Sequence, residues 1–290
     1  MSKARVAFLG LGIMGSGMAR RLLAAGFPVI AYNRNPDKSA AIAKEGAKSA
    51  QSPREAAAQA DVIVSMLADD VAARAIWQGD QGALVGAAKG STLIECSTAS
   101  VSWVRELAAA AKAQGCEFLD APVTGSKTQA AAGELNFLVG GAEPALARVR
   151  PILDAMGRSI TLLGPTGSGA MVKLINNFVC GVQAVSLAEA LAMIERTGLD
   201  REKALGVLVN GAPGSPMVKA LSTRMASRDY TPNFLLRLMT KDLAYAIKEG
   251  AAAGIELTSA KAAHQAYTRA IEKGEGEKDL AAVIEQYRQR

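Results

Sequence analysis

The sequence is poor in histidine and cysteine, the residues that most often bind metals, form disulfides or take part in a catalytic triad. Its 290 residues include one histidine, His264, and three cysteines at positions 96, 116 and 180. The cysteines are odd in number, far apart and in apolar surroundings, so they predict neither a disulfide framework nor a metal site. With a single histidine in an alanine-rich stretch, the chain also lacks a Ser-His-Asp set. We therefore expect a protein without metal, in a reducing compartment.

Aromatic residues are also scarce, at 4% of the chain, and the basic residues form no run. The net charge of +6 and pI near 9.3 thus favour small acidic or phosphorylated molecules over nucleic acid as partners. No signal-peptide pattern precedes the first strand pattern, and the longest apolar stretch is interrupted by Lys173, Gln183 and Glu189. These features predict a soluble cytoplasmic protein that has no membrane partner.

A glycine-rich motif lies near the N-terminus in a specific context. An apolar run at 5–9 leads into Gly10-Leu-Gly-Ile-Met-Gly15, and a helical pattern at 16–25 and a strand pattern at 29–32 follow. Strand, G-x-G-x-x-G, helix and strand within about 30 residues form the dinucleotide-binding fingerprint, in which backbone N–H groups at the helix start bind phosphate. The residues expected to contact the cofactor here are Gly10, Leu11, Gly12, Ile13, Met14 and Gly15.

The end of the second strand bears on which dinucleotide binds. NAD-binding sites usually place Asp or Glu there to hold the ribose 2′-hydroxyl. This chain has Asn33-Arg34-Asn35 instead, so no acid repels a 2′-phosphate and Arg34 can pair with one. We therefore expect Asn33 and Arg34 to contact the cofactor, with NADP(H) preferred over NAD(H).

Alternating strand and helix patterns continue to about residue 163. Ligands of such folds bind beyond the carboxyl ends of the strands, which singles out Met66, Leu67 and Ala68, then Ser97-Thr98, then the segment 120–127. From Gly164 the pattern is helical, beginning with a proline-free stretch that is apolar on nearly every face and ends near Gly198. The sequence thus predicts an α/β Rossmann domain over 1–163 and an all-α domain over 164–290, joined by a long interdomain helix.

Polar residues on that long helix are candidates for chemistry. Lys173, Asn176 and Asn177 share one helical face because they are spaced by three and four residues. Hydride transfer to a carbonyl develops negative charge on oxygen, which a nearby ammonium stabilises and protonates. Lys173 is therefore the candidate general acid, the alternative being a structurally paired lysine. Thr124-Gly125-Ser126 offers hydroxyl and N–H groups to a carboxylate, the alternative being an ordinary turn.

Four motifs together resemble the β-hydroxyacid dehydrogenase family: the residues 10–15, Asp120-Ala-Pro-Val-Thr-Gly-Ser126, the segment 167–177, and Lys241-Asp242-Leu243. The family includes 3-hydroxyisobutyrate dehydrogenases, tartronate semialdehyde reductases and glyoxylate/succinic semialdehyde reductases. The resemblance implies a catalytic acid/base and a homodimer or homotetramer assembled through the helical half. By the same resemblance Lys173 is that acid/base, Asn177, Thr124, Gly125 and Ser126 bind substrate, and Thr98, Phe234 and Lys241 line the cofactor site.

One departure from the family pattern narrows the choice of function. Many members have Ser-Gly-Gly where this chain has Thr124-Gly125-Ser126, followed by Lys127, a version that looks like the glyoxylate/succinic semialdehyde reductase branch. The sequence therefore predicts an NADPH-dependent reductase of a small aldehyde acid. An NAD-dependent dehydrogenase of the 3-hydroxyisobutyrate or tartronate semialdehyde type stays open, as does a non-catalytic Rossmann protein that senses nucleotide.

Overall fold

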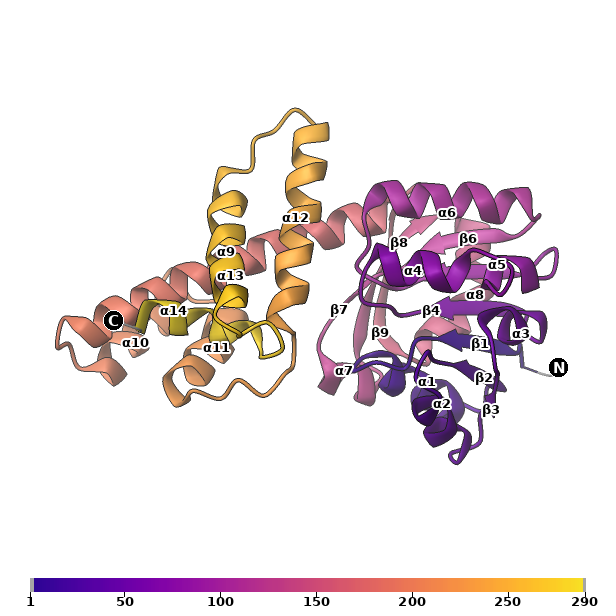
Figure 1. Ribbon diagram of the computed structural model, residues 1–290, viewed down its shortest axis with the longest axis horizontal. Coiled ribbons are helices and arrows are strands. Elements are labelled where there is room, and N and C mark those ends of the chain that lie inside the picture. The colour runs from indigo at the N-terminus through magenta and orange to yellow at the C-terminus, as the bar shows by residue number, and fades with distance from the viewer. Residues whose placement is uncertain (1–2, 289–290) are drawn as a thin grey trace. The chain divides into compact units, whose positions relative to one another are not determined.

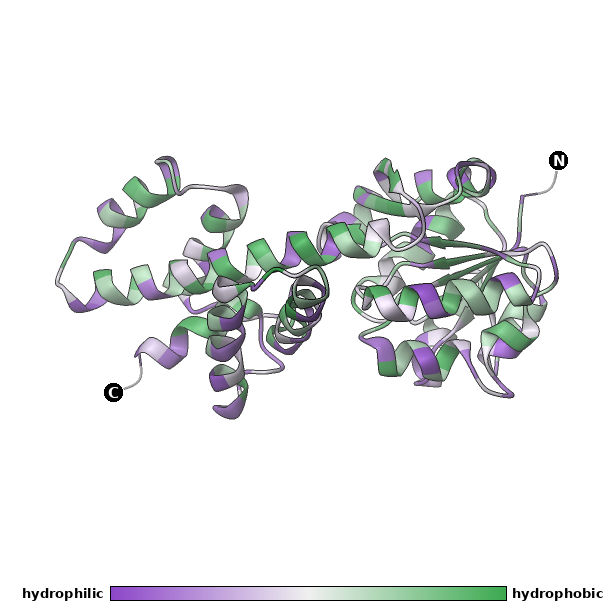
Figure 2. Cartoon of the chain, turned by 90° about the horizontal axis from the view of Figure 1, so that it is seen from above, coloured by the Kyte–Doolittle hydropathy of each residue, from purple (hydrophilic) through white to green (hydrophobic). Residues whose placement is uncertain are grey.

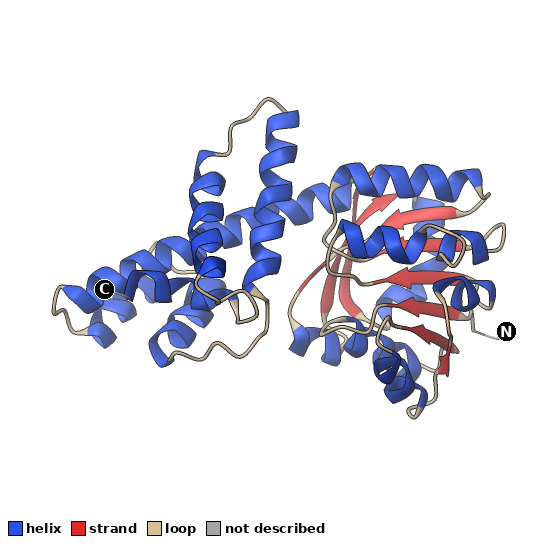
Figure 3. Cartoon of the chain, in the orientation of Figure 1, coloured by secondary structure: helices blue, strands red, loops and turns tan. Residues whose placement is uncertain are grey.

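The computed structural model describes residues 3–288, which divide after Lys173 into two compact units. The first contains a nine-stranded sheet with helices on both faces, and the second is helical (Figures 1 and 3). The long helix α9 (Ser168–Arg196) begins in the first unit and continues into the second. The boundary expected at 163/164 falls at the end of β9, and the first unit extends beyond it through the first turns of α9.

The sheet has the strand order β3-β2-β1-β4-β5-β6-β8-β7, with β9 paired to β8. Neighbouring strands from β3 to β6 are parallel, whereas β8 runs antiparallel to β6 and β7. The strands are β1 (Val6–Leu9), β2 (Val29–Tyr32), β3 (Lys48–Ser49), β4 (Val62–Ser65), β5 (Thr92–Glu95), β6 (Glu117–Asp120), β7 (Val123–Thr124), β8 (Leu135–Gly141) and β9 (Gly157–Gly164).

The register of the parallel strands brings their carboxyl ends together on one side of the sheet, across the strand direction. Leu9 pairs with Tyr32 and Ser65, Ser65 pairs with Glu95, and Glu95 pairs with Asp120. The strands themselves are apolar, as their green colour in Figure 2 shows, because helices bury both faces of the sheet. The loops that follow these strands therefore meet at a single edge, where ligands of this architecture bind.

The helices of the first unit begin at recognisable caps. The side chains of Asn35, Ser52, Asp69 and Ser100 each accept a hydrogen bond from a first-turn amide. The helices are α1 (Gly15–Ala24), α2 (Pro36–Ala43), α3 (Pro53–Ala58), α4 (Asp70–Trp77), α5 (Ala83–Gly86), α6 (Val101–Ala113), α7 (Lys127–Ala132) and α8 (Glu143–Asp154).

The helical unit packs around a core of its own. Its elements after α9 are α10 (Arg201–Asn210), α11 (Pro216–Ser227), α12 (Leu236–Ala252), α13 (Thr258–Glu272), the 3-10 helix η1 (Leu280–Ile284) and α14 (Glu285–Arg288). Alanines of α13 and the fully buried Tyr267 pack with Leu191 of α9 and with η1, whose five residues are all buried. The last helical stretch of the described chain therefore starts as a 3-10 helix, held in the core by its apolar side chains.

Helix α9 is less buried than its composition predicts. It is long and apolar enough to cross a membrane by length and composition, a test that core helices of soluble proteins also pass, and half of its most apolar window is buried in this chain. The sequence predicts burial on several sides, whereas Ile175, Val179 and Met193 remain 50%, 46% and 67% exposed. A single chain thus leaves one face of α9 uncovered.

Candidate functional site

The glycine motif forms the turn between β1 and α1. Gly10 has φ +99°, and a Cβ there would lie 2.4 Å from the carbonyl oxygen of Met66. A Cβ at Gly15 would lie 2.0 Å from the carbonyl oxygen of Gly10, whereas one at Gly12 would meet nothing within 4 Å. The outer two glycines therefore allow close backbone packing, and the middle one leaves open space for a ligand.

The start of α1 can receive an anion. Met14 at the N-cap position makes no side-chain hydrogen bond to a first-turn amide, although Ser16 N donates to the Gly12 carbonyl oxygen at 3.1 Å. The start of a helix presents N–H groups and a positive dipole end, which suit a phosphate. Leu11 N donates to Asn33 Oδ1 at 2.9 Å, and Ser16 Oγ donates to the Leu11 carbonyl oxygen at the same distance. Asn33, expected to contact the cofactor, thus holds the glycine turn in shape through its own side chain.

A cavity of about 350 Å³ lies beside this turn. It gathers residues expected from the sequence (Gly10, Gly12, Asn33, Arg34, Met66, Leu67 and Ala68) and others that were not (Asn35, Lys38, Ala72, Ala75 and Ile76). No Asp or Glu is among these described lining residues. The pocket therefore joins an apolar wall from α4 to the cations of Arg34 and Lys38, a lining that suits an anionic nucleotide.

Lys38 is the functional candidate that the sequence reasoning missed. It lies on α2 four residues after Arg34, and it lines both this cavity and a neighbouring hollow that also contains Gly12 and Arg20. The signal was present in the sequence as a lysine in the first turn of the helix that follows the second strand. By contrast, Arg20 is already paired with Glu45 through hydrogen bonds of 2.8–3.0 Å.

A buried carboxyl and a serine side chain hold the loops that follow β4 and β5. Glu95, fully buried at the end of β5, accepts hydrogen bonds from Trp77 Nε1 and from Ser97 N, both at 2.9 Å. Ser97 Oγ in turn accepts from Leu67 N at 2.7 Å. Burial raises the pKa of Glu95, against the effect of these hydrogen bonds. The loop that bears residues 66–68 is thus linked through the Ser97 side chain to the loop that bears the half-buried Thr98.

The candidate carboxylate site is the turn between β7 and α7. Thr124 Oγ1 accepts from Asn136 Nδ2 at 3.2 Å, which leaves the Thr124 hydroxyl proton available for another acceptor. Ser126 N and Oγ both donate to Gln129 Oε1, at 2.9 and 2.6 Å. The turn is therefore pre-ordered by its own side chains, and Ser126 must exchange its partner to bind a ligand through its hydroxyl.

In the first unit, Lys173 is half-buried on the second turn of α9. In the helical unit, one turn further along the same helix, Asn177 is 3% exposed and donates to Asp242 Oδ2 at 2.6 Å. Asn176 Nδ2 donates to Asn177 Oδ1 at 3.0 Å. The Asn177 amide is therefore held in one orientation by a carboxylate and a second amide.

Lys241 and Asp242 are more than a surface pair. Asp242 is 1% exposed, and Lys241 Nζ lies 3.0 Å from its Oδ1 and 5.1 Å from the centre of the Tyr245 ring. An isolated Lys-Asp pair is most often solvated, whereas Asp242 is buried and accepts a hydrogen bond from Asn177 of α9. Phe234 is half-buried against the helical core, and its N–H donates to Asp279 Oδ2 at 3.0 Å.

No group of three His, Cys, Asp or Glu side chains within residues 3–288 is arranged to hold a metal ion. The parallel sheet, the glycine turn and the adjoining cavity together define a dinucleotide-binding protein of the Rossmann class.

Comparison with known proteins agrees with this class and refines it. Residues 5–164 match the family described as the NAD binding domain of 6-phosphogluconate dehydrogenase, and residues 167–287 match the NAD-binding domain of NADP-dependent 3-hydroxyisobutyrate dehydrogenase. Mouse mitochondrial 3-hydroxyisobutyrate dehydrogenase is 34% identical, over 99% of this chain and 88% of that protein. The chloroplastic glyoxylate/succinic semialdehyde reductase 2 of Arabidopsis thaliana is 35% identical, over 97% and 78%.

A solved structure of the 3-hydroxyisobutyrate dehydrogenase of Mycobacterium tuberculosis with L-serine matches with a TM-score of 0.90 and 33% identity, over 99% of this chain and all of that one. This chain therefore belongs to the β-hydroxyacid dehydrogenase family and is an NAD(P)-dependent oxidoreductase. The fold and family expected from the sequence are confirmed.

Proposed function

We propose that this protein reduces a small aldehyde acid, such as glyoxylate or succinic semialdehyde, to the hydroxy acid, with NADPH as the preferred reductant. The observation that carries the cofactor preference is the pair Arg34 and Lys38 in a cavity whose described lining residues include no acid. A 2′-phosphate is attracted there, whereas the ribose 2′-hydroxyl of NADH finds no carboxylate partner.

The substrate class is argued from the turn at Thr124 to Ser126. Its hydroxyl and N–H groups suit a carboxylate, and the pre-ordered Asn177 amide suits a second oxygen. The similarity to a glyoxylate/succinic semialdehyde reductase supports the same class.

A nicotinamide cofactor, when bound beside the glycine turn, would supply the hydride that reduces the carbonyl carbon. The Lys173 ammonium donates its proton to the carbonyl oxygen, so that an alcohol forms and Lys173 is left neutral. In the reverse direction neutral Lys173 takes the proton from the hydroxyl group. A cation at this position stabilises the charge that develops on oxygen, so it acts more on the transition state than on the bound substrate.

A second candidate is NAD-dependent oxidation of a 3-hydroxy acid, of the 3-hydroxyisobutyrate or tartronate semialdehyde type. The M. tuberculosis relative with L-serine supports it, because serine also carries a primary alcohol next to an acid-bearing carbon. The discriminating feature is the cofactor pocket, since this second function requires productive binding without a 2′-phosphate.

The test is the absorbance at 340 nm with purified protein, each of NADPH and NADH, and a panel of glyoxylate, succinic, tartronate and methylmalonate semialdehydes. Faster oxidation of NADPH than of NADH with glyoxylate or succinic semialdehyde supports the proposed function. Activity confined to NAD⁺ with 3-hydroxyisobutyrate or L-serine replaces it by the second candidate. Cofactor binding without turnover of any pair would instead indicate a nucleotide sensor.

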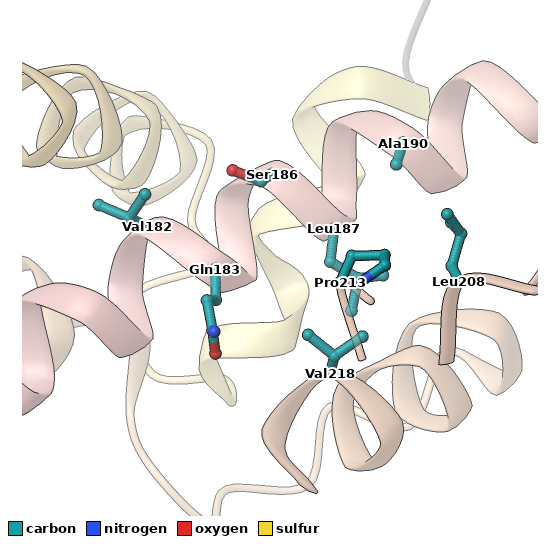
Figure 4. A pocket seen from close by; sticks show the side chains of 8 residues that line it. All are labelled: Val182, Gln183, Ser186, Leu187, Ala190, Leu208, Pro213 and Val218. Atoms are coloured by element: carbon teal, nitrogen blue, oxygen red, sulfur yellow. The ribbon is translucent and has the colours of Figure 1, made fainter. Parts of the chain in front are cut away.

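We also propose that the protein works as a homodimer or homotetramer through the helical unit. Positions 175, 179, 182, 186, 190 and 193 share one face of α9, and they are apolar except for Ser186. Figure 4 shows part of this face beside Leu208, Pro213 and Val218, around a hollow of about 340 Å³. An exposed stripe of this kind on a core helix is typical of a protein interface.

Light scattering after gel filtration tests the assembly. Val179→Glu with Met193→Glu should yield monomers, whereas the control Ile255→Glu, at a 58% exposed position off this face, should not. A wild-type monomer at micromolar concentration would refute the assembly.

A cytoplasmic location is proposed as well, since the three cysteines form no disulfide in the described chain, and cell fractionation tests it.

A further inference from the structure

The carboxyl group of Asp120 serves as a helix cap from a distant part of the chain. Asp120 ends β6 and is fully buried. Its Oδ1 accepts a hydrogen bond from Gly167 N at 2.8 Å, and its Oδ2 accepts one from Ala170 N at 2.9 Å. These amides lie 47 and 50 residues further along the chain, at the start of α9. A strand end thus satisfies amides that a helix start leaves without partners.

The surroundings of this carboxyl group leave it little freedom to move. A Cβ at Gly140, on β8, would lie 2.5 Å from Asp120 Oδ1, and one at Gly169 would lie 2.2 Å from the carbonyl oxygen of Leu138. The absence of side chains at these two positions lets β6, β8 and α9 approach closely. Burial raises the pKa of Asp120, while the N–H groups of Gly167, Gly169 and Ala170 favour its charged form.

Asp120 stands between two parts of the proposed reaction site: its side chain holds one of them, and the other follows it along the chain. Lys173 is one helical turn beyond Ala170, so its backbone position follows from the cap. The turn at 124–126 begins four residues after Asp120, and pairing of Thr124 with Asn136 holds it against β8. A reaction between groups held by different elements depends on placement within a fraction of an ångström.

We propose that Asp120 is a positioning residue for the Lys173 ammonium. Its carboxylate fixes the first turn of α9 against the strand end from which the carboxylate-binding turn departs. It contacts neither substrate nor cofactor in this role and acts through the helix. The inference rests on the acid/base function proposed for Lys173.

The test compares Asp120→Asn, Lys173→Ala and the double variant. Asparagine keeps the size of the side chain but places an NH₂ group against one of the two amides, so one cap bond is lost. Because a misplacement of about 1 Å costs up to about 100-fold in rate, we expect kcat of Asp120→Asn to fall about 10- to 100-fold. The dissociation constant of NADPH, measured by its fluorescence, should stay within about twofold of the wild-type value.

The double variant distinguishes positioning from general loss of structure. If Asp120 acts through Lys173, the double variant is no slower than Lys173→Ala alone, because the effects of coupled residues are not additive. If Asp120→Asn fails to fold, Gly140→Ala supplies a second variant. It displaces the Asp120 carboxyl group without removing it, and we expect its effect on kcat to be coupled to Lys173→Ala in the same way.

The control is Asp61→Asn. Asp61 also accepts a backbone bond, from Arg5 N at 2.9 Å, and pairs with the Arg5 guanidinium group, but it lies just before β4, at the amino-terminal end of the parallel strands and so opposite to the proposed site. The Asp61→Asn variant should have a lower melting temperature than the wild type and an unchanged kcat. The positioning role is overturned if Asp120→Asn keeps the wild-type kcat. It is also overturned if the double variant is slower than Lys173→Ala alone. Normal turnover in Lys173→Ala itself would instead overturn the proposed function.

Discussion

Removing the positive charges of the cofactor cavity should change which dinucleotide the enzyme uses. Arg34 follows β2 and Lys38 lies on the first turn of α2, and both line the cavity beside Gly12. Both side chains are exposed, so solvent weakens their pairing with a phosphate. The perturbations are Arg34→Ala, Lys38→Ala and the two together.

The size of the effect follows from this exposure. A cation–phosphate contact here should contribute about 1–1.5 kcal/mol, between the value of an exposed ion pair and that of a buried charge-assisted hydrogen bond. Each single variant should thus lose about 5- to 12-fold in kcat/KM with NADPH. Because the two side chains share one phosphate, the double variant should lose less than the product of the two factors. With NADH, kcat/KM should stay within about twofold.

Initial rates with both cofactors, at fixed aldehyde acid and two salt concentrations, provide the assay. Arg20→Ala is the matched control: Arg20 lines the neighbouring hollow, but Glu45 already neutralises it, so its loss should leave NADPH use unchanged. Equal losses with NADPH and NADH in Arg34→Ala and in the double variant would refute the reasoning, because they would show that these cations do not recognise the 2′-phosphate.

Three further predictions concern the remaining polar groups. Lys173→Ala should lower kcat by about 100-fold or more while NADPH binding is retained, as single-turnover and fluorescence measurements can establish; unchanged turnover would contradict the mechanism. Asp242→Asn should lower the free energy of unfolding in urea by about 1–3 kcal/mol, since Asn177 and Lys241 both lose a buried carboxylate. The same variant should raise KM for the aldehyde acid, and an unchanged KM would remove Asn177 from the substrate site. Burial raises the pKa of Glu95, so its contribution to stability is complete below its ordinary value of 4.5 and is lost as pH rises through the folded pKa. Glu95→Gln should therefore gain in melting temperature relative to wild type between pH 4.5 and pH 7.5, and a constant difference would contradict this.

Much of the fold is readable in the sequence because its signals are local. The apolar run before Gly10, the glycine spacing and the cap residues before α4 and α6 each act within a few residues. The two-residue strands β3 and β7 are too short to show any periodicity, and their pairing depends on neighbouring strands. The antiparallel direction of β8 is likewise set by long-range hydrogen bonding that leaves no local pattern.

In the candidate site, too, some residues are recognisable from local sequence, whereas their partners are revealed only by the structure. Arg34, Lys173 and Asn177 are recognisable by residue type and by their place after a strand or on one helical face. The partners that orient such groups are distant in sequence: Asn33 supports Leu11, and Asp242 supports Asn177 across 65 residues. Lys38 was within reach of sequence reasoning, yet only the cavity shows that it faces the same space as Arg34.

The sequence by itself determined the Rossmann class, the helical second half, the family and the residues that can do chemistry, because these depend on periodicity, glycine spacing and residue type. Only the tertiary structure decided that Asp120 caps α9, that Ser97, held by the buried Glu95, links the loops after β4 and β5, and that one face of α9 is left uncovered. The physical reason is that buried carboxylates require partners, and which amide meets which carboxylate is fixed by packing of segments far apart in the chain.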